Sequence, residues 1–228
     1  MPDERLAPEQ LVSELEIIRD DTLAATRSGL YGRLTFGDKS KPPGARREVV
    51  AVLQMLLYPE RRVPDVLARR FESIPDFDLK ERTAHQIREE IEHAQLIQKM
   101  LEQWGMDGEK GWREPIPELV KIFDYIESLE TLSEFFSTFL MGEGLFLSTY
   151  LDDMQRADPD AFSPYLAAAL ADEPGHIALA RDALLRYAST PKIQARTRDS
   201  AQRLLAMFLG GYQARIREFN ATLEVAPV

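Results

Sequence analysis

Apolar residues recur at helical spacing over most of the chain, and no stretch alternates with the period of a β-strand. The pattern predicts a long first helix over residues 8–34. Two shorter helical pieces follow, at 47–58 and 64–73. Because proline lacks a backbone donor and breaks regular helices, Pro59 and Pro64 predict an interruption between these two pieces.

The second half of the chain predicts longer helices. A helical pattern over 79–104 ends at Gly105, a residue typical of helix C-termini. Pro117 opens a helical stretch that runs to about residue 155, and its second half is apolar almost all round, as in a buried central helix. Two further helices are predicted at 163–187 and 190–223, where a proline stands close to each start.

These elements predict an all-α fold with a single domain over residues 1–228. Four helices are long enough to form a bundle, and the helix at 190–223 would pack outside it. Residues 35–77 fit a loop with short helices, inserted near the N-terminus. Apolar residues on the last helix fit either the core or an interface in a homo-oligomer or hetero-oligomer; these are Leu204, Leu205, Met207, Phe208 and Leu209.

Composition narrows the chemistry and the partners. The chain has no cysteine, so any metal must be held by oxygen and imidazole ligands, and a reducing cytoplasm is the expected location. The formal net charge of −10 argues against a nucleic-acid partner, which would need clustered Lys and Arg. The N-terminus has no signal-peptide pattern and no apolar run suits a membrane span, so no membrane association is expected.

The three histidines are used selectively. Two of them stand three residues after a glutamate, in the pairs Glu90 with His93 and Glu173 with His176. Positions i and i+3 share one face of a helix, so each pair directs a carboxylate and an imidazole into the same space. Two such pairs, completed by one lone carboxylate on each of two other helices, form the two-metal centre of ferritin-like bundles. The third histidine, His85, has no such partner and is interpreted as structural or exposed.

Glu143 is the candidate for one lone carboxylate. Its neighbours on the same helical face are apolar: Phe139, Leu140, Phe146 and Leu147. An unpaired ionised glutamate there would cost several kcal/mol, and metal coordination removes this cost. Glu89 and Asp172 precede the two paired glutamates, and acids at such positions can accept the second N–H of a metal-bound imidazole.

Two candidates compete for the other lone carboxylate. Glu143 lies thirty residues before Glu173, and Glu60 lies thirty residues before Glu90, so a pseudo-twofold arrangement favours Glu60. The length of the first helix favours Asp21 instead, because the prolines around Glu60 predict a helix break. Asp21 is slightly preferred, and the sixth ligand stays open between the two.

The stretch KERTAHQIREEIEHAQLIQKMLEQWG resembles the catalytic subunit of phenylacetyl-CoA epoxidase, a di-iron carboxylate oxygenase with a ferritin-like fold. The family motif is an acidic pair followed by x-x-H, which Glu89, Glu90 and His93 match. A second copy is similar at Asp172, Glu173 and His176. The resemblance covers roughly residues 79–187. Pro174 and Gly175 depart from it and predict a local distortion of the π-bulge kind in that helix.

The resemblance implies an oxidoreductase of the monooxygenase type. Two iron ions, or manganese, would be held by Glu90, His93, Glu143, Glu173 and His176, with Glu143 taking part in catalysis by shifting its coordination. The substrates would be O₂ and a small organic molecule or acyl-CoA, and an external reductase would supply electrons, because no flavin or nicotinamide motif is present. The alternatives are a ferroxidase or other iron-handling protein, a tRNA-modifying hydroxylase of the same fold, and a structural subunit without metal.

Overall fold

A computed structural model describes residues 6–25 and 38–224, and for residues 25 and 211–224 only the backbone. All regular structure within these ranges is helical. The long helices are α1 (Pro8–Ala25), α2 (Arg47–Phe71), α3 (Phe77–Gln103), α5 (Pro117–Ser128), α6 (Leu132–Phe146), α9 (Tyr165–Tyr187) and α10 (Pro191–Glu224). The short ones are the 3₁₀-helix Pro43–Ala45, α4 (Lys110–Arg113), the π-helix Leu147–Leu151, α7 (Asp152–Ala157) and α8 (Pro159–Phe162). The prediction of an all-α fold is confirmed.

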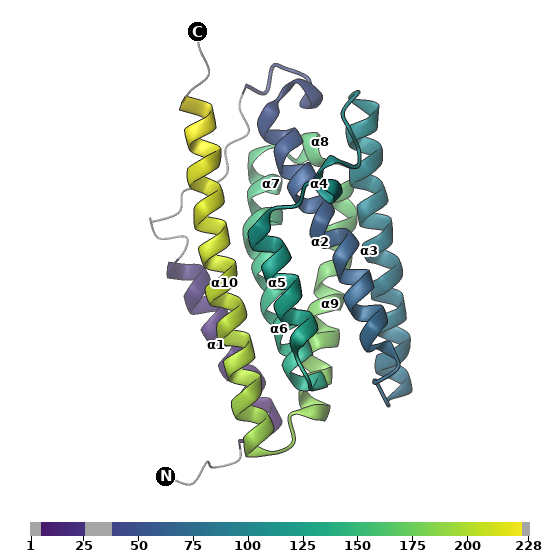
Figure 1. Ribbon diagram of the computed structural model, residues 1–228, viewed down its shortest axis with the longest axis vertical. Helices are drawn as coiled ribbons and strands as arrows, with labels where there is room; N and C mark the ends of the chain where they lie inside the picture. The colour runs from purple at the N-terminus through teal and green to yellow at the C-terminus, as the bar shows by residue number, and fades with distance from the viewer. Residues whose placement is uncertain (1–5, 26–37, 225–228) are drawn as a thin grey trace.

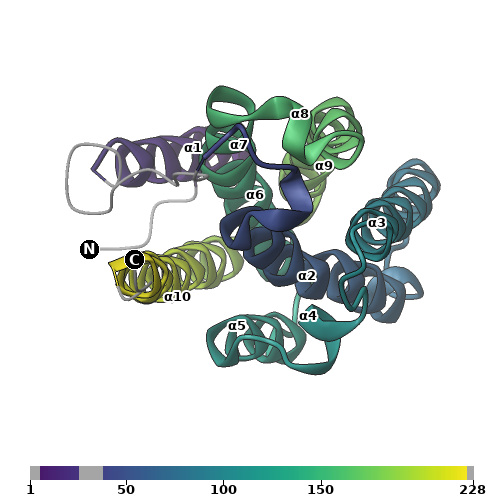
Figure 2. The ribbon, with the colours of Figure 1, turned by 90° about the horizontal axis from the view of Figure 1, so that it is seen from above.

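Four helices surround the middle of the molecule. Helix α2 packs against α3, α6 packs against α9, and α3 also contacts α9 (Figures 1 and 2). Helix α10 lies outside them against α6 and α5, as expected for the last helix. Helix α1 contacts α6, α9 and α10 on the same outer side, so α2 occupies the place in the four-helix arrangement that was predicted for the first helix. The part of that predicted helix beyond residue 25 lies outside the described residues.

Helix α2 is continuous, and the predicted break between residues 58 and 64 is wrong. Both Pro59 and Pro64 lie inside the helix. A proline in a helix interior costs roughly 3 kcal/mol. Fully burying one Val or Leu side chain contributes about 1.5–3 kcal/mol, and seven such side chains of this helix are 3% exposed or less: Val49, Val52, Leu53, Leu56, Leu57, Val66 and Leu67. Core packing therefore outweighs the two prolines and keeps Glu60 on a helix.

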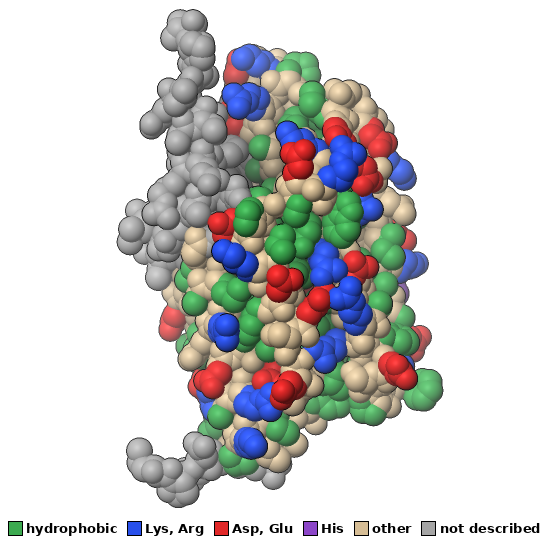
Figure 3. Space-filling view, in the orientation of Figure 1, with side chains coloured by type: hydrophobic (Ala, Val, Ile, Leu, Met, Phe, Trp, Pro, Cys, Tyr) green, Lys and Arg blue, Asp and Glu red, His purple; other side chains and the backbone are tan. Residues whose placement is uncertain are grey.

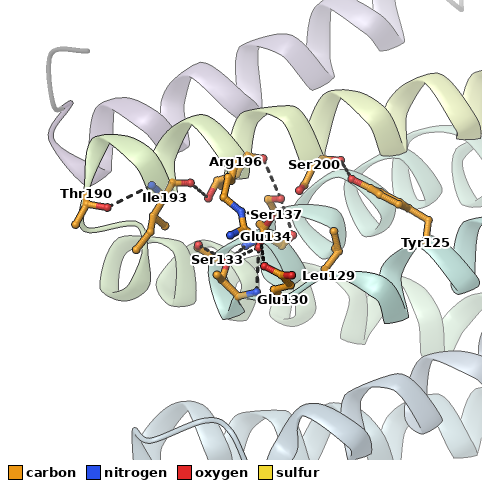
Figure 4. A network of polar contacts seen from close by, with 12 residues as sticks. Tyr125, Leu129, Glu130, Ser133, Glu134, Ser137, Thr190, Ile193, Arg196 and Ser200 are labelled. Atoms are coloured by element: carbon orange, nitrogen blue, oxygen red, sulfur yellow. Dashed lines mark hydrogen bonds and ion pairs between the residues drawn. The ribbon is translucent and has the colours of Figure 1, made fainter. Parts of the chain in front are cut away.

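The predicted helix over 117–155 is divided into shorter elements. Helix α5 ends at Ser128, and α6 begins after Thr131, which caps it. The Thr131 hydroxyl accepts a hydrogen bond from the Glu134 backbone N–H (3.2 Å), and the Glu134 carboxylate accepts one from the Thr131 N–H (2.9 Å). Arg196 of α10 donates to Glu134 (2.9 Å) and to Glu130 (2.6 Å), which ties the start of α6 to the outer helix (Figure 4).

The last helix belongs partly to the core. Leu204 and Leu205 are buried, and Met207 and Phe208 pack against the buried clusters. Charged side chains of both signs are scattered over the face seen in Figure 3, between apolar areas. No helix in the described ranges combines the length and the apolar character that crossing a membrane requires. The apolar residues at 204–208 are thus accounted for by packing within this chain.

Candidate metal centre

Six side chains from four helices meet in the interior of the bundle. Glu60 comes from α2, Glu90 and His93 from α3, Glu143 from α6, and Glu173 and His176 from α9; all six are buried. The structure thus brings the five residues singled out in the sequence into one cluster. It adds Glu60, which is 3% exposed, whereas Asp21 lies on the exposed side of α1. The structure thus places Glu60 in the cluster and not Asp21, because the prolines of α2 do not break its helix.

The imidazoles of His93 and His176 point Nδ1 into the cluster. His93 Nδ1 lies 3.3 Å from Glu60 Oε2 and 3.7 Å from Glu90 Oε2. His176 Nδ1 lies 3.2 Å from Glu90 Oε1 and 3.4 Å from Glu173 Oε2. Neither Nδ1 atom makes a hydrogen bond, and neither does Glu60 Oε2 or Glu173 Oε2. Four buried atoms that can bind a metal ion therefore face the same interior space, and none of them has a hydrogen-bond partner.

The outer nitrogen of each imidazole is held by an acid from the opposite helix. His93 Nε2 on α3 donates to Asp172 of α9 (3.0 Å), and His176 Nε2 on α9 donates to Glu89 of α3 (3.1 Å). The sequence predicted that these acids would accept the imidazole N–H groups, and both do so across the helix pair. Such hydrogen bonds fix which nitrogen faces a metal and make it a better ligand. The third histidine, His85, was interpreted as structural or exposed, and the structure shows that it is exposed. Its Nδ1 lies 2.9 Å from Glu89 Oε1.

Two polar groups of the cluster have no counterpart in the sequence analysis. Gln86 is buried, and its amide donates to Glu90 Oε1 (3.2 Å) and Glu143 Oε1 (3.3 Å). Its position four residues before Glu90, on the same helical face, is the signal that could have found it. The hydroxyl of Tyr165, a fully buried residue of α9, donates to Glu60 Oε1 (2.5 Å). No local pattern links Tyr165 to Glu60, because the two come together only through tertiary packing.

The cluster is electrostatically strained without a cation. Burial raises the pKa of Glu143 to about 7, and the charge of Glu90 adds to this. Burial and the neighbouring Glu143 raise the pKa of Glu173 well above its usual value. Burial alone would lower the pKa of His93, but the neighbouring carboxylates of Glu60 and Glu90 raise it to about 12. Without metal, the fold therefore holds protons on these groups to limit repulsion among carboxylates.

The donor atoms fit divalent cations. One ligand atom from each of Glu60, Glu90 and His93 lies within 4.8 Å of the others, and the same holds for Glu90, Glu143 and His176. Glu90 belongs to both groups, so two cations placed there would share it. Carboxylate and imidazole ligands suit iron, manganese and zinc alike. The buried Glu and His side chains could therefore hold a metal ion. The atoms that lack hydrogen bonds are the ones that would coordinate it.

Glu143 sits between two glycines, and each has a structural reason. A Cβ at Gly144 would clash with the Arg19 side chain of α1, which lies 2.5 Å from that position, so the glycine lets α1 approach α6. Gly142 faces the cavity described below.

A π-helical turn, Leu147–Leu151, follows Glu143 after one turn of helix. The predicted distortion at Pro174 and Gly175 is absent, because α9 continues as an α-helix through them.

A cavity of ≈ 130 Å³ borders the cluster on one side. It lies among α2, α5, α6 and α10, and its inner end is formed by Glu60, Glu90, Glu143 and Glu173. Most other wall residues are apolar, among them Val63, Leu119, Ile122, Phe123, Ile126, Phe139, Phe146, Leu204 and Phe208. An apolar ligand in this space would touch the carboxylates directly.

The chain matched no protein-family model, no curated protein and no solved structure. The geometry nevertheless gives a definite chemical result. Four carboxylates and two imidazoles, contributed by four helices, form a buried centre with inward-facing lone pairs and an adjoining apolar cavity.

Proposed function

We propose that this protein is an O₂-dependent oxidoreductase of the ferritin-like class, which holds two iron ions and oxidises a small organic substrate. The observation that carries the proposal is the convergence of Glu60, Glu143 and the two Glu-x-x-His pairs from four different helices. A lone Glu on each of two helices, with a Glu-x-x-His pair on each of the other two, is the ligand set of carboxylate-bridged two-metal bundles.

The crossed acids support the same class of site. In the resemblance to the phenylacetyl-CoA epoxidase subunit, an acidic residue precedes each metal-binding glutamate. Here those residues are Glu89 and Asp172, and each holds the imidazole of the opposite helix. An exposed Glu-x-x-His pair without metal would not require this second hydrogen bond. Both motifs therefore have the supporting contacts that metal-binding histidines usually have.

Each part of the chain has a distinct task in this proposal. Glu60, Glu90, Glu143 and Glu173 bind the cations and balance their charge, while Asp172 and Glu89 keep the ring protons on the outer nitrogens. Two bound iron ions would supply the activation of O₂. Incorporating one oxygen atom into the substrate and releasing the other as water consumes two electrons and two protons, so an external reductase must act as partner. The apolar wall of the cavity excludes water from the substrate.

The cavity favours organic oxidation over iron handling alone. A ferroxidase needs a path for hydrated cations, and polar or acidic side chains usually line such a path. The walls here are mainly apolar away from the four cluster carboxylates. A cavity of this character instead suits a substrate with little polar surface. Metal loading far beyond two ions per chain would favour the iron-handling alternative.

The first experiment measures metal content and O₂ consumption of protein expressed in iron-supplemented medium. We expect about two iron atoms per chain, and loss of both in the Glu143→Ala, His176→Ala double variant. The reduced, iron-loaded protein should consume O₂ when supplied with a chemical reductant and a substrate.

The matched control is Glu92→Ala. Glu92 stands next to His93 on α3, but its side chain is 57% exposed and points away from the cluster. This variant should keep its iron and its O₂ consumption. Wild-type protein that binds no iron, manganese or zinc would rule out the proposal, and so would iron content that stays unchanged in the double variant.

A further inference from the structure

The walls of the cavity beside the metal centre indicate what it binds. Its inner end is closed by the four cluster carboxylates. The remaining walls come mainly from α2, α5, α6 and α10, and several of the apolar wall residues are only partly buried, including Leu119 of α5 and Ile116, which directly precedes this helix. Hydrophobic side chains gather over the upper part of α5 on the face shown in Figure 3. The cavity thus extends from the metal centre toward the surface near the start of α5.

The charge of the walls selects against anions. Among the described residues that line the cavity, the charged ones are all acidic: the four cluster glutamates and Glu118. A carboxylate or phosphate group on a ligand needs a cation or several N–H donors, and none of these lining residues is Lys, Arg or His. The hydroxyl of Thr138 is already donated to the Phe135 carbonyl (2.7 Å). A ligand with an anionic group inside this cavity would therefore place a negative charge beside acidic side chains, with no cationic side chain among the lining residues to balance it.

The size of the cavity limits the ligand further. An apolar cavity of about 150 Å³ lined by aliphatic and aromatic side chains stays dry and binds benzene. The volume here is ≈ 130 Å³, and apart from the glutamates most of the wall residues are aliphatic or aromatic as well. We propose that the cavity binds a neutral, apolar molecule of about the size of benzene, and that such molecules are the substrate class of the metal centre. The second half of this statement rests on the proposed function, whereas the first half does not.

A substitution at Gly142 can test whether the cavity binds such a ligand. It lines the cavity on α6, one residue before Glu143, and a Cβ built there would meet only Leu204 Cδ2, at 3.9 Å. A Cβ atom at this position therefore has room, and we expect a valine side chain there to take up part of the cavity. Gly210 offers a matched control, since it is an exposed glycine of α10 with no atom within 4 Å of its Cβ position, and it does not line the cavity.

The experiment titrates the full-length chain with benzene, both metal-free and with Zn²⁺ added, and follows methyl resonances by ¹H–¹³C NMR. We expect saturable shifts at methyl groups of the lining residues Val63, Leu119, Ile122, Ile126 and Leu204. Gly142→Val should raise the dissociation constant at least tenfold, and Gly210→Val should leave it unchanged. Benzoate, which has the same ring with a negative charge, should bind at least tenfold more weakly than benzene.

A second variant guards against misfolding of Gly142→Val. Leu119→Trp narrows the cavity from the opposite wall, on the partly exposed helix α5, and should weaken benzene binding as well. Absence of saturable shifts in the wild-type chain, benzoate binding as tightly as benzene, or unchanged binding in folded Gly142→Val and Leu119→Trp would each overturn the inference. Benzene binding without metal uptake would retain the cavity assignment and reject the proposed oxidation, while metal uptake with O₂ consumption but no benzene binding would do the reverse.

Discussion

Tyr165 donates a 2.5 Å hydrogen bond to Oε1 of Glu60, from the opposite side of the bundle. The other oxygen of that carboxylate, Oε2, has no hydrogen-bond partner and faces Nδ1 of His93 at 3.3 Å. Burial and the charge of Glu60 raise the pKa of Tyr165 well above its usual value, so the phenol remains a donor at all working pH values. The tyrosine therefore turns Glu60 so that a single oxygen is available to a cation.

Replacing this donor tests its role as a positioning residue. Tyr165→Phe should weaken metal binding by about 10- to 100-fold, the range typical for groups that orient metal ligands. Competition titrations with a chelator on the Mn²⁺-loaded protein measure the change. Tyr125→Phe is the matched control, because its hydroxyl donates to the Ser200 carbonyl between α5 and α10 (Figure 4), away from the cluster. Equal affinities of the Tyr165 variant and the wild type would show that Glu60 needs no such support.

The choice between Glu60 and Asp21 can be tested by removing each carboxylate. Glu60→Ala should lower the metal content from about two ions per chain to about one, because the group formed by Glu60, Glu90 and His93 loses a ligand. Asp21→Ala should leave the content unchanged, since Asp21 is exposed on α1. Elemental analysis of both purified variants provides the measurement. The reverse pattern would assign the sixth ligand to α1.

The sequence could not decide between these two residues on local rules. The prolines on either side of Glu60 predict a helix break, and the long apolar pattern of 8–34 predicts a central helix. In the structure, buried side chains of α2 outweigh both prolines, and α1 lies outside the four central helices. The thirty-residue spacing favours Glu60, the residue that the structure places in the cluster, because this spacing reflects the repeated helix pair and not a single segment.

Five residues of the cluster, the two Glu-x-x-His pairs and Glu143, can be predicted from the sequence because the patterns that mark them are local. A carboxylate and an imidazole three residues apart, or a glutamate in an apolar stretch, can be recognised without knowing the tertiary structure. Gln86 and Tyr165 join the cluster from positions that carry no such mark, apart from the spacing of Gln86 to Glu90. The apolar pattern over 117–155 hides the division between α5 and α6, although Thr131 and Glu134 have the T-x-x-E spacing of a capping box.

The crossed hydrogen bonds can be tested by NMR of the histidine side chains. The spectrum is simple because the chain has only three histidines. Asp172→Asn should change the ¹⁵N ring shifts of His93 on α3 and leave those of His176. Glu89→Gln should change His176 on α9, together with the exposed His85 that also contacts Glu89. NMR of the metal-free protein with ¹⁵N-labelled histidine checks both. If each substitution affected instead the histidine of its own motif, the crossed arrangement would be wrong.

The cap of α6 should contribute measurably to stability. Thr131→Ala removes the acceptor for the Glu134 N–H and is expected to lower the free energy of unfolding by about 1 kcal/mol, the usual cost of losing an N-cap side chain. Urea denaturation of the metal-free protein measures it. Ser128→Ala, an exposed hydroxyl at the end of α5, should have a smaller effect. Comparable losses in both variants would mean that the cap does not stabilise the start of α6.

The stability of the metal-free protein should fall as pH rises from 6 to 9. The pKa of Glu143 is about 7 in the fold against an ordinary 4.5, so the native state keeps a proton that the unfolded chain loses, and this contribution declines up to pH 7. The pKa of His93 is about 12 against 6.5, so its contribution is complete below pH 6.5 and is lost progressively above it.

The titrations of Glu143 and His93 therefore both lower the stability of the metal-free protein as the pH rises from 6 to 9. Bound metal should oppose the trend, because coordination requires the deprotonated ligands and becomes stronger as pH rises. Thermal unfolding at several pH values, with EDTA or with added Mn²⁺, compares the two states. Glu143→Gln removes one of the two titrating groups, so the decline between pH 6 and 7 should be smaller in this variant. Stability of the metal-free wild type that stays level or increases over pH 6–9 would contradict the protonated cluster described above.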